Sequence, residues 1–208
     1  MGPVSPRVIV QPDEGAQPVR DFIASAQRSL LIKQFTFVEQ SLVAAVIERH
    51  RAGVAVRVML NAARSGGDRA NDETFEQFSA AGVDVRWSNP SFYVTHEKSI
   101  VVDEQAALVA TFNLCEKYFT LTRDYGVITT DSQQVAQIVE VFDADWSRTD
   151  WEPTAYHGLL WSNSNSRYHM AKFIDTAEER LRIQHPKYVD AVILDHIAAA
   201  VGRGVHVH

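Results

Sequence analysis

Residues Phe22–Gln34, FIASAQRSLLIKQ, contain the pattern that decides the fold, because they join an amphipathic helix to a short apolar strand. The helix is predicted from Pro18 onward, since apolar residues recur at helical spacing as far as Leu30, and the strand follows over residues 31–37. The same pattern returns without a gap 151 positions later, in Phe173–His185, FIDTAEERLRIQH. A helix-to-strand pattern that occurs twice in one register indicates an internal repeat.

The elements around the first copy alternate between strand and helix. Strands are expected at residues 8–10, 54–60 and 83–87, and helices at residues 41–53 and 71–82. Ser41 and Asn71 are suited to cap the two helices, whereas Gly53 and Gly82 are suited to end them. This alternation predicts an α/β fold with a mixed, largely parallel sheet flanked by helices.

The repeat also predicts the domain organisation. Residues 8–58 and 159–208 align as two copies of one βαβαβ unit. Any two βαβ segments share apolar spacing, but a gap-free register that also matches a glycine favours duplication. We therefore predict one complete repeat in residues 1–150. Residues 151–208 would be the N-terminal part of a second repeat, truncated before the stretch that carries the polar motif of the first.

The composition limits the class of protein. The chain has 208 residues, of which 46% are hydrophobic, and a formal net charge of −6. This charge argues against a protein that coats nucleic acid, although a local basic pocket is compatible with it. Cys115 is the only cysteine, so a disulfide framework and a cysteine zinc cluster are excluded, and we expect no metal and no cofactor. Without a signal-peptide pattern or a run of 18 apolar residues, the sequence predicts a cytoplasmic protein, with peripheral membrane contact left open.

Residues Val94–Asp103, VTHEKSIVVD, place polar side chains in the middle of an apolar strand. Period-2 alternation puts His96 and Lys98 on one face of this strand and Asp103 on the other. A second apolar run follows at residues 106–114, so the two segments are expected to form a β-hairpin.

The length of the hairpin loop determines which residues meet across the two strands. A loop of two or four residues places Lys98 opposite Thr111 and His96 opposite Asn113, at the distance where cross-strand side chains interact. A three-residue loop would break this register. In the even register an imidazole, an ammonium, a hydroxyl and a carboxamide share one face.

Such a group of side chains suits the chemistry of a phosphate ester. Imidazole can attack phosphorus and leave again, which splits one difficult displacement into two easier ones. The lysine, asparagine and threonine supply positive charge and hydrogen-bond donors to oxygens that gain charge in the transition state. Asp103 points away from the group, so we expect it to bind backbone at the strand end rather than carry a proton.

His96-x-Lys98-x₄-Asp103, followed by Ala110-Thr111-Phe112-Asn113, resembles the HxKxxxxD signature of the phospholipase D superfamily. The repeat, the order of strands and helices, the hairpin and the later stretch 123–126, RDYG, also resemble that superfamily, in particular bacterial cardiolipin and phosphatidylserine synthases. The resemblance implies a phospholipase D-like fold and a metal-independent phosphodiesterase or phosphatidyltransferase of lipid metabolism. One departure is Ala110-Thr111, where the superfamily usually has Gly-Ser, and the extra bulk would narrow the pocket.

The resemblance also implies roles for individual residues. His96 would form a phosphohistidine, Lys98 and Asn113 would bind phosphate oxygens, and Asp124 would orient a catalytic histidine. Asp103 and Thr111 would support them. Members of the superfamily build one active site from two motifs, so the C-terminal half of the same protein or a second subunit would complete the site. Without that partner, we expect this chain to be inactive.

One candidate lies outside the motif. His185 follows the repeated second strand, and strand ends in such sheets often face the site, so it is a candidate for substrate contact. Taken together, the sequence predicts displacement at a phospholipid-type phosphodiester, with water or an alcohol as acceptor. Two alternatives stay open: a nuclease with the same chemistry, which the acidic composition disfavours, and a catalytically incomplete half.

Overall fold

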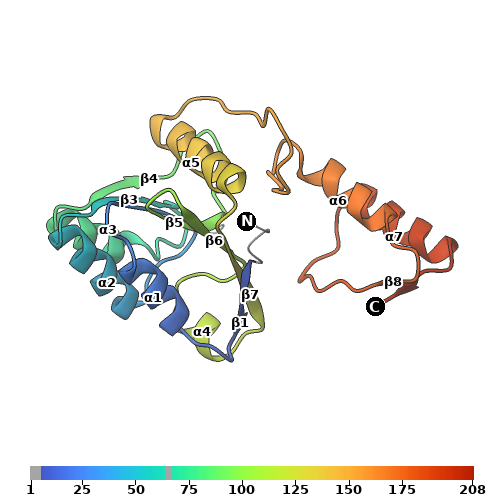
Figure 1. The fold of residues 1–208 in the computed structure, drawn as a ribbon, viewed down its shortest axis with the longest axis horizontal. Helices are drawn as coiled ribbons and strands as arrows, with labels where there is room; N and C mark the ends of the chain where they lie inside the picture. The colour runs from blue at the N-terminus through green and yellow to red at the C-terminus, as the bar shows by residue number, and fades with distance from the viewer. Residues whose placement is uncertain (1–5, 64–66) are drawn as a thin grey trace. The chain divides into compact units, whose positions relative to one another are not determined.

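The computed structural model describes residues 6–63 and 67–208 of the chain. The chain divides into two compact units, Met1–Trp151 and Glu152–His208. Figure 1 labels most of the helices and strands of both units. Among the described residues, no helix is both long enough and apolar enough to cross a lipid bilayer.

A seven-stranded sheet forms the centre of the first unit, in the order β1-β7-β6-β5-β2-β3-β4. Its strands are β1 (Arg7–Gln11), β2 (Ser29–Gln34), β3 (Ala55–Leu60), β4 (Asp84–Trp87), β5 (Lys98–Val102), β6 (Ala106–Ala110) and β7 (Asp124–Thr129). β2, β3 and β4 pair in parallel, whereas the other four pairings are antiparallel.

The mixed α/β class is therefore confirmed, but the expectation of a largely parallel sheet is wrong. Two strands account for the difference. β1 does not lie beside β2, as its position in a βαβ unit suggested, but pairs with β7 at the far edge of the sheet. β5 then runs back along β2 in the antiparallel direction.

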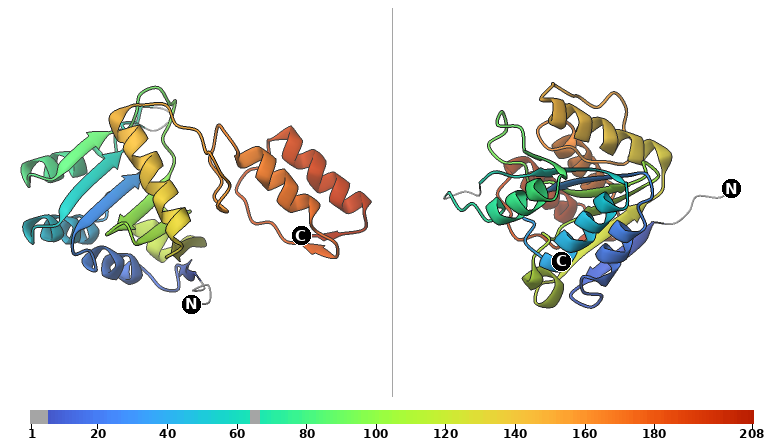
Figure 2. Two further views of the ribbon diagram at one scale, coloured as in Figure 1. Left: turned by 45° about the horizontal axis from the view of Figure 1, so that its top comes forward. Right: turned by 90° about the vertical axis from the view of Figure 1, so that its left-hand side faces the viewer.

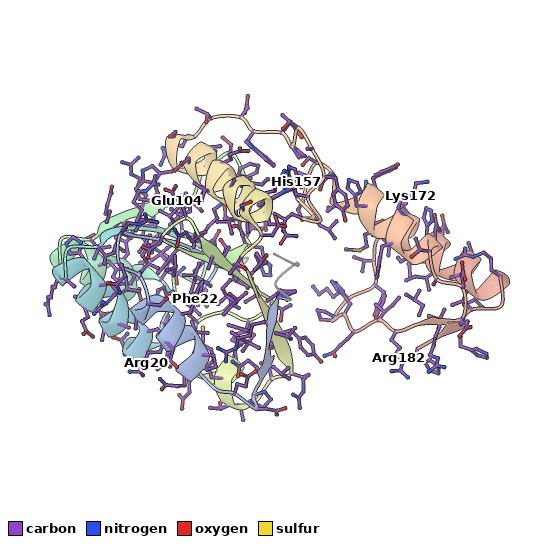
Figure 3. The ribbon with its side chains drawn as sticks, in the orientation of Figure 1. Arg20, Phe22, Glu104, His157, Lys172 and Arg182 are labelled. Atoms are coloured by element: carbon purple, nitrogen blue, oxygen red, sulfur yellow. The ribbon has the colours of Figure 1, made fainter. Side chains whose placement is uncertain are left out.

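Helices cover both faces of this sheet, as the right-hand view of Figure 2 shows. One face carries α1 (Gln17–Ala24), α2 (Gln40–Arg51), α3 (Asp72–Ala80) and the short α4 (Glu116–Thr120), and the other carries α5 (Ser132–Ser147). The main core lies on the first face, where Val19 and Ile23 of α1 are buried in one cluster with Ile100 and Leu108 of the hairpin strands. Phe22, labelled in Figure 3, packs against this cluster from α1.

Some element boundaries differ from those predicted. α1 ends at Ala24, and Leu30 belongs to β2 rather than to the helix. Ser41 lies inside α2, whose N-cap residue is Glu39. Gly53 follows the end of α2 with a φ of 90°, the left-handed conformation expected of a glycine at this position.

β5 and β6 form the predicted hairpin, but the loop between them has three residues. Val102 pairs with Ala106 at the end of the ladder. Within the loop, Asp103 and Glu104 have φ values of 56° and 54°, in the left-handed region that few residue types adopt. Glu104 is labelled in Figure 3.

The odd-numbered loop shifts the pairing of β5 with β6 by one residue from the predicted register. The predicted cross-strand pairs, Lys98 with Thr111 and His96 with Asn113, are therefore wrong. On its other side β5 pairs with β2, and Gln34 lies opposite Lys98 at the end of that ladder. The surroundings of the motif thus depend on β2 as well as on the hairpin.

The second unit contains α6 (Ser166–Asp175), β8 (Arg180–Leu181), α7 (Ala191–Gly202) and β9 (His206–Val207). β8 and β9 pair in parallel, and Arg180 lies opposite His206. In the first unit Ser29 lies opposite Ala55, 151 positions earlier on both strands. Gly204 has a φ of 89°, and the glycine 151 positions before it has a φ of 90°. The assignment of this unit to a second repeat stays a prediction, which these correspondences support.

Candidate active site

The motif lies at the end of the sheet where β2 ends and β5 begins. His96 precedes β5 and Lys98 is its first residue, so alternation puts both side chains on the face that carries Ile100 of the core. Lys98 Nζ lies 3.2 Å from His96 Nδ1 and donates a hydrogen bond of 2.7 Å to the carbonyl oxygen of His96. The structure therefore brings together the two side chains that alternation predicted to share a face.

Phe35, the first residue after β2, packs against both side chains. Its ring centroid lies 4.5 Å from that of His96, and Lys98 Nζ lies 5.1 Å from the same centroid. Lys98 is buried, with 4% of its surface exposed, whereas His96 is exposed. The ammonium thus forms the floor of the site, and the imidazole remains accessible to a substrate.

The surroundings of the site lower the pKa of both His96 and Lys98. Burial lowers the pKa of Lys98 to about 8, against the opposing influence of Asp124, Cys115 and Glu97. Burial, followed by the Lys98 charge, lowers the pKa of His96 below its ordinary value. At neutral pH the imidazole is therefore unprotonated and keeps the lone pair that a nucleophile needs.

Thr111 and Asp124 lie together at the neighbouring ends of β6 and β7. Thr111 Oγ1 donates a hydrogen bond of 2.7 Å to Asp124 Oδ1 and accepts one of 2.9 Å from the Tyr125 amide. The carboxylate of Asp124 also acts on the pKa of Lys98. The structure thus links these two predicted residues to Lys98, while none of the hydrogen bonds formed by the described residues joins Asp124 to His96 directly.

Asn113 lies in the segment after β6, which runs beside the end of β2. Leu114 next to it donates its amide to the Thr36 carbonyl at 3.0 Å, which fixes this segment beside the end of β2. Asn113 is 6% exposed, and its Oδ1 has no protein partner. Gln34 Oε1 and Thr36 Oγ1 at the end of β2 are likewise buried without a partner. Unpartnered buried polar atoms are costly, so their presence near one strand end is typical of a binding site.

Sequence reasoning missed Gln34 and Thr36 at the end of β2, and the two asparagines that hold the neighbouring loops. Asn71 donates to the carbonyls of Phe35 and Asn61, at 2.9 Å in each case. Asn61 Oδ1 in turn accepts from the amide of Thr95 at 3.0 Å. The available signal was the position of these residues: Asn61 directly follows the predicted strand at residues 54–60, and Gln34 lies within the strand predicted at residues 31–37.

Asp103 follows the end of β5 that is opposite to His96 and Lys98. Its Oδ1 accepts hydrogen bonds from the amides of Gln27 at 3.1 Å, Arg28 at 2.7 Å and Ser29 at 2.9 Å. Burial acts to raise its pKa, but these hydrogen bonds outweigh that effect and lower the pKa. The carboxylate therefore connects the hairpin loop to the start of β2, which agrees with the backbone-binding role expected from alternation.

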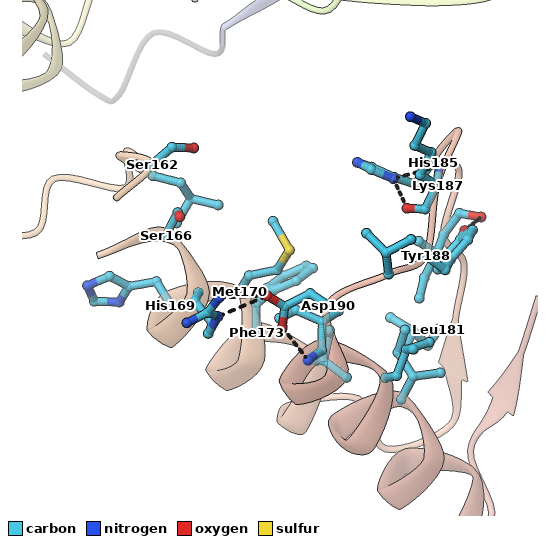
Figure 4. Close-up of a pocket in the computed structure, with 18 of the residues that line it drawn as sticks. Ser162, Ser166, His169, Met170, Phe173, Leu181, His185, Lys187, Tyr188 and Asp190 are labelled. Atoms are coloured by element: carbon cyan, nitrogen blue, oxygen red, sulfur yellow. Dashed lines mark hydrogen bonds and ion pairs between the residues drawn. The ribbon is translucent and has the colours of Figure 1, made fainter. Parts of the chain in front are cut away.

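His185 lines a cavity of 1120 Å³ that consists entirely of residues from the second unit (Figure 4). Its Nδ1 contacts the backbone of Lys187. Apolar side chains such as Met170, Phe173 and Leu181 form much of the wall. His185 thus belongs to a different part of the chain from His96, and its role in substrate contact stays a prediction. Residues 6–63 and 67–208 contain no group of three or more His, Cys, Asp or Glu side chains arranged to hold a metal ion.

Comparisons with known proteins place the chain in one family through a family model. A family model described as cardiolipin synthase, PLD-like domain matches residues 19–146. The mitochondrial cardiolipin hydrolase of Chlamydomonas reinhardtii is 27% identical over 128 residues, which cover 61% of this chain and 55% of that relative. The chain therefore spans little more than half the length of this curated relative.

Two further matches extend the comparison. Polyphosphate kinase of Salmonella typhimurium is 24% identical over 185 residues, which cover 82% of this chain and 26% of the kinase. Among solved structures, Nuc from Salmonella typhimurium, described as a phospholipase D family member, superposes with a TM-score of 0.63 at 21% identity, over 72% of this chain and 99% of Nuc. This structural likeness shows a shared fold.

Proposed function

The chain belongs to the PLD-like domain family of cardiolipin synthase, and on that premise we propose that it displaces an alcohol from a phospholipid phosphodiester through a phosphohistidine at His96. The membership confirms the resemblance that the sequence suggested and makes the first unit a phosphodiesterase-like domain. The observation that supports a phosphohistidine at His96 is the contact of its exposed, neutral imidazole with the buried ammonium of Lys98, whose Nζ lies 3.2 Å from His96 Nδ1.

In the proposed reaction, a nitrogen of His96 attacks phosphorus while the bond from phosphorus to the leaving alcohol breaks. The electron pair of that bond goes to the alcohol oxygen, which takes up a proton. Lys98 and the Asn113 carboxamide bind the two non-bridging oxygens, whose charge increases in the transition state. Water or a second alcohol then attacks phosphorus, releases the imidazole and gives up its own proton. Each donor of this kind is worth about 3–4 kcal/mol of barrier.

We further propose that the proton donor comes from a second motif, either in a polypeptide segment beyond the second unit or in a second subunit. The 208 residues contain a single His-x-Lys-x₄-Asp sequence. The second unit supports this proposal, because apolar side chains in it are more exposed than those 151 positions earlier in the first unit. Val19 and Val43 are 0% and 2% exposed, whereas Met170 and Leu194, 151 positions later, are 40% and 42% exposed.

The exposed tip before the motif favours a lipid over a nucleic acid as substrate. Phe92, Tyr93 and Val94 are 43%, 90% and 36% exposed, and they end one residue before Thr95 and two before His96. Aromatic side chains with an apolar body and a polar end suit the interface between water and lipid. We propose that this tip contacts the lipid surface while the head group reaches His96. The net charge of −6 gives no support to a nucleic acid partner.

A nitrophenyl phosphodiester tests the mechanism without the proton donor proposed for the second motif. Nitrophenolate leaves as an anion, so this substrate needs no protonation of the leaving group. We expect a burst of nitrophenolate equal to the amount of chain, and phosphate bound covalently to His96 on peptide mapping. His96→Asn should abolish both signals, whereas His50→Asn, a matched change on α2 outside the motif, should keep them. Release of nitrophenolate that is unchanged by His96→Asn would contradict the mechanism. To rank substrates, phosphatidylglycerol vesicles and single-stranded DNA are compared as competitors of the burst, and stronger inhibition by DNA would favour the nuclease.

A second candidate follows from the extent of one match. The similarity to polyphosphate kinase covers 82% of this chain and so extends beyond the first unit, unlike the match to the cardiolipin hydrolase. A histidine that attacks a phosphodiester is also able to attack a phosphoanhydride. The distinguishing measurement is labelling of His96 by radioactive polyphosphate, which the phosphodiesterase proposal does not predict.

A further inference from the structure

His96 lies outside the hydrogen-bonded sheet, so something other than strand pairing must fix its position. The ladder between β2 and β5 begins with Lys98 opposite Gln34, and residues 94–97, directly before Lys98, belong to no strand. Before His96, the amide of Thr95 binds the Asn61 side chain at 3.0 Å. After His96, the backbone is held through the side chain of Glu97.

Glu97 points to the face of the sheet opposite His96 and Lys98. Its Oε2 accepts a hydrogen bond of 3.0 Å from Lys33 Nζ on β2, and its Oε1 accepts one of 2.6 Å from Ser99 Oγ. Lys33 also binds Asp145 Oδ2 on α5 at 2.6 Å. Lys33 is fully buried, whereas the side chains of Glu97 and Asp145 are 23% and 17% exposed. The buried ammonium of Lys33 thus connects Glu97, which lies between His96 and Lys98, to α5 on the other face of the sheet.

We propose that Glu97, Lys33 and Asp145 act as positioning residues, which hold the peptide between His96 and Lys98 so that both side chains face the substrate. The inference rests on the proposed function, for which it names residues that never touch the substrate. A buried ion pair is weak evidence for a stabilising role, because well-packed apolar residues commonly give equal or greater stability at such a site.

The placement of the ion group is what points to positioning. Glu97 contacts Lys33 on one face of the sheet, whereas Lys98 contacts His96 on the other. A carboxylate fixed at 3.0 Å to a rigid cation on the far face therefore determines the direction of His96 on the near face. Burial lowers the pKa of Lys33, but the two carboxylates outweigh it and raise the pKa, so the cation keeps its charge across the physiological range.

Glu97→Gln is the variant that separates positioning from folding. It removes one of two carboxylates and leaves Lys33 paired with Asp145, so no buried charge loses its only partner. Asp143→Asn is the matched control, because it breaks the 2.7 Å pair between Arg57 on β3 and Asp143 on α5 without contact to the motif. Both variants and the wild-type chain are compared by titration of the His96 imidazole with NMR, which needs neither substrate nor turnover.

The two explanations predict opposite signs for this titration. If Glu97 acted on His96 only through its charge, its loss would lower the pKa of His96 further. If Glu97 positions the residue, the imidazole moves away from Lys98 and Phe35, and its pKa rises toward the ordinary value. We expect a rise in Glu97→Gln, a smaller rise in Ser99→Ala, and no change in Asp143→Asn. A pKa that falls or stays constant in Glu97→Gln would overturn the proposal.

The burst assay with the nitrophenyl phosphodiester gives a second readout. A displacement of about 1 Å at a reacting group costs roughly 100-fold in rate, so we expect the burst rate in Glu97→Gln to fall between 10- and 100-fold with little change in the substrate concentration at half-saturation. A comparable loss in Asp143→Asn would count against a positioning role. If the wild-type chain shows no burst, the proposed function fails, while the NMR titration still decides the positioning role. If Glu97→Gln does not fold, Ser99→Ala, which removes a neutral hydrogen bond, decides it by the same titration.

Discussion

The hairpin loop offers a quantitative test, because the carboxylate of Asp103 holds three backbone amides of the segment before β2. The oxygen–nitrogen distances are 3.1, 2.7 and 2.9 Å for Gln27, Arg28 and Ser29. A hydrogen bond to a charged group contributes about 1.5–3 kcal/mol, and solvent exposure reduces this value. We therefore expect Asp103→Ala to lower the free energy of unfolding by about 3 kcal/mol, including ~1 kcal/mol for alanine in a left-handed conformation.

Asp103→Asn separates charge from shape, since asparagine tolerates the φ of 56° and keeps one acceptor oxygen. We expect a loss of about 1–2 kcal/mol for this variant. Glu104→Asn is the control, because Glu104 has nearly the same φ of 54° in the same loop. It should change the free energy of unfolding by less than about 0.5 kcal/mol. Urea unfolding at pH 7, followed by circular dichroism, measures all three values.

The pH dependence adds a second check on the same carboxylate. The pKa of Asp103 is lowered in the folded chain, so the stability that it contributes is fully present above the unfolded pKa of about 3.9. It is lost as the pH falls through the lower, folded pKa. The gap between wild type and Asp103→Asn should thus be constant above about pH 5 and close in acid. An unchanged unfolding midpoint at pH 7, or a gap that persists in acid, would refute the assignment of Asp103 to this structural role.

Three further outcomes follow from the geometry of the site and the strand behind it. Lys98→Met should raise the pKa of His96 toward its ordinary value, because the positive charge at 3.2 Å contributes to the lowering; NMR titration measures it, and an unchanged pKa would contradict the contact. Binding of inorganic phosphate should weaken as the pH rises through about 8, where Lys98 loses its charge, and calorimetry of Lys98→Met should lack this step. Gly126→Ala should destabilise the first unit by about 1–3 kcal/mol, since the added methyl would lie 3.0 Å from Leu108 and 3.1 Å from Phe112; an unchanged melting temperature would show that these side chains can move.

The features that sequence predicted correctly are those set by local periodicity. Alternation put His96 and Lys98 on one face, where the structure brings them within 3.2 Å, and the expected contact of Asp103 with backbone is present at the other end of β5. Helix-ending glycine chemistry likewise identified the turn at Gly53, which has a φ of 90°. These properties depend on covalent geometry over a few residues, so a single sequence carries enough information to predict them.

The features that could not be predicted from the sequence include the length of the hairpin loop, because loops of two, three and four residues have similar local energies. The loop after Val102 has three residues because Asp103 and Glu104 both adopt left-handed backbone, and neither residue type requires that conformation. This choice shifted the hairpin register by one residue and removed the predicted opposition of His96 and Asn113. The ion group at Lys33 was invisible for a different reason. A lysine in an apolar strand gains its partners from Glu97, 64 positions away, and from a helix 112 positions away.

A comparison of the two units suggests that completing the fold and forming the site are one event. In the first unit, the apolar face of the βαβ element at β2 and β3 is closed by the antiparallel strands β5 and β6, whose Ile100 and Leu108 enter the core. The segment that closes the core therefore also delivers His96 and Lys98 to the end of β2. In the second unit β8 and β9 pair in parallel, as β2 and β3 do 151 positions earlier, but apolar side chains such as Phe173, which is 71% exposed, line an open cavity. Under the proposal that a second motif completes the site, a hairpin that buried this face in the same register would bring its own polar residues to the strand end beside His185, so the energy of apolar burial would also assemble a second set of reactive groups.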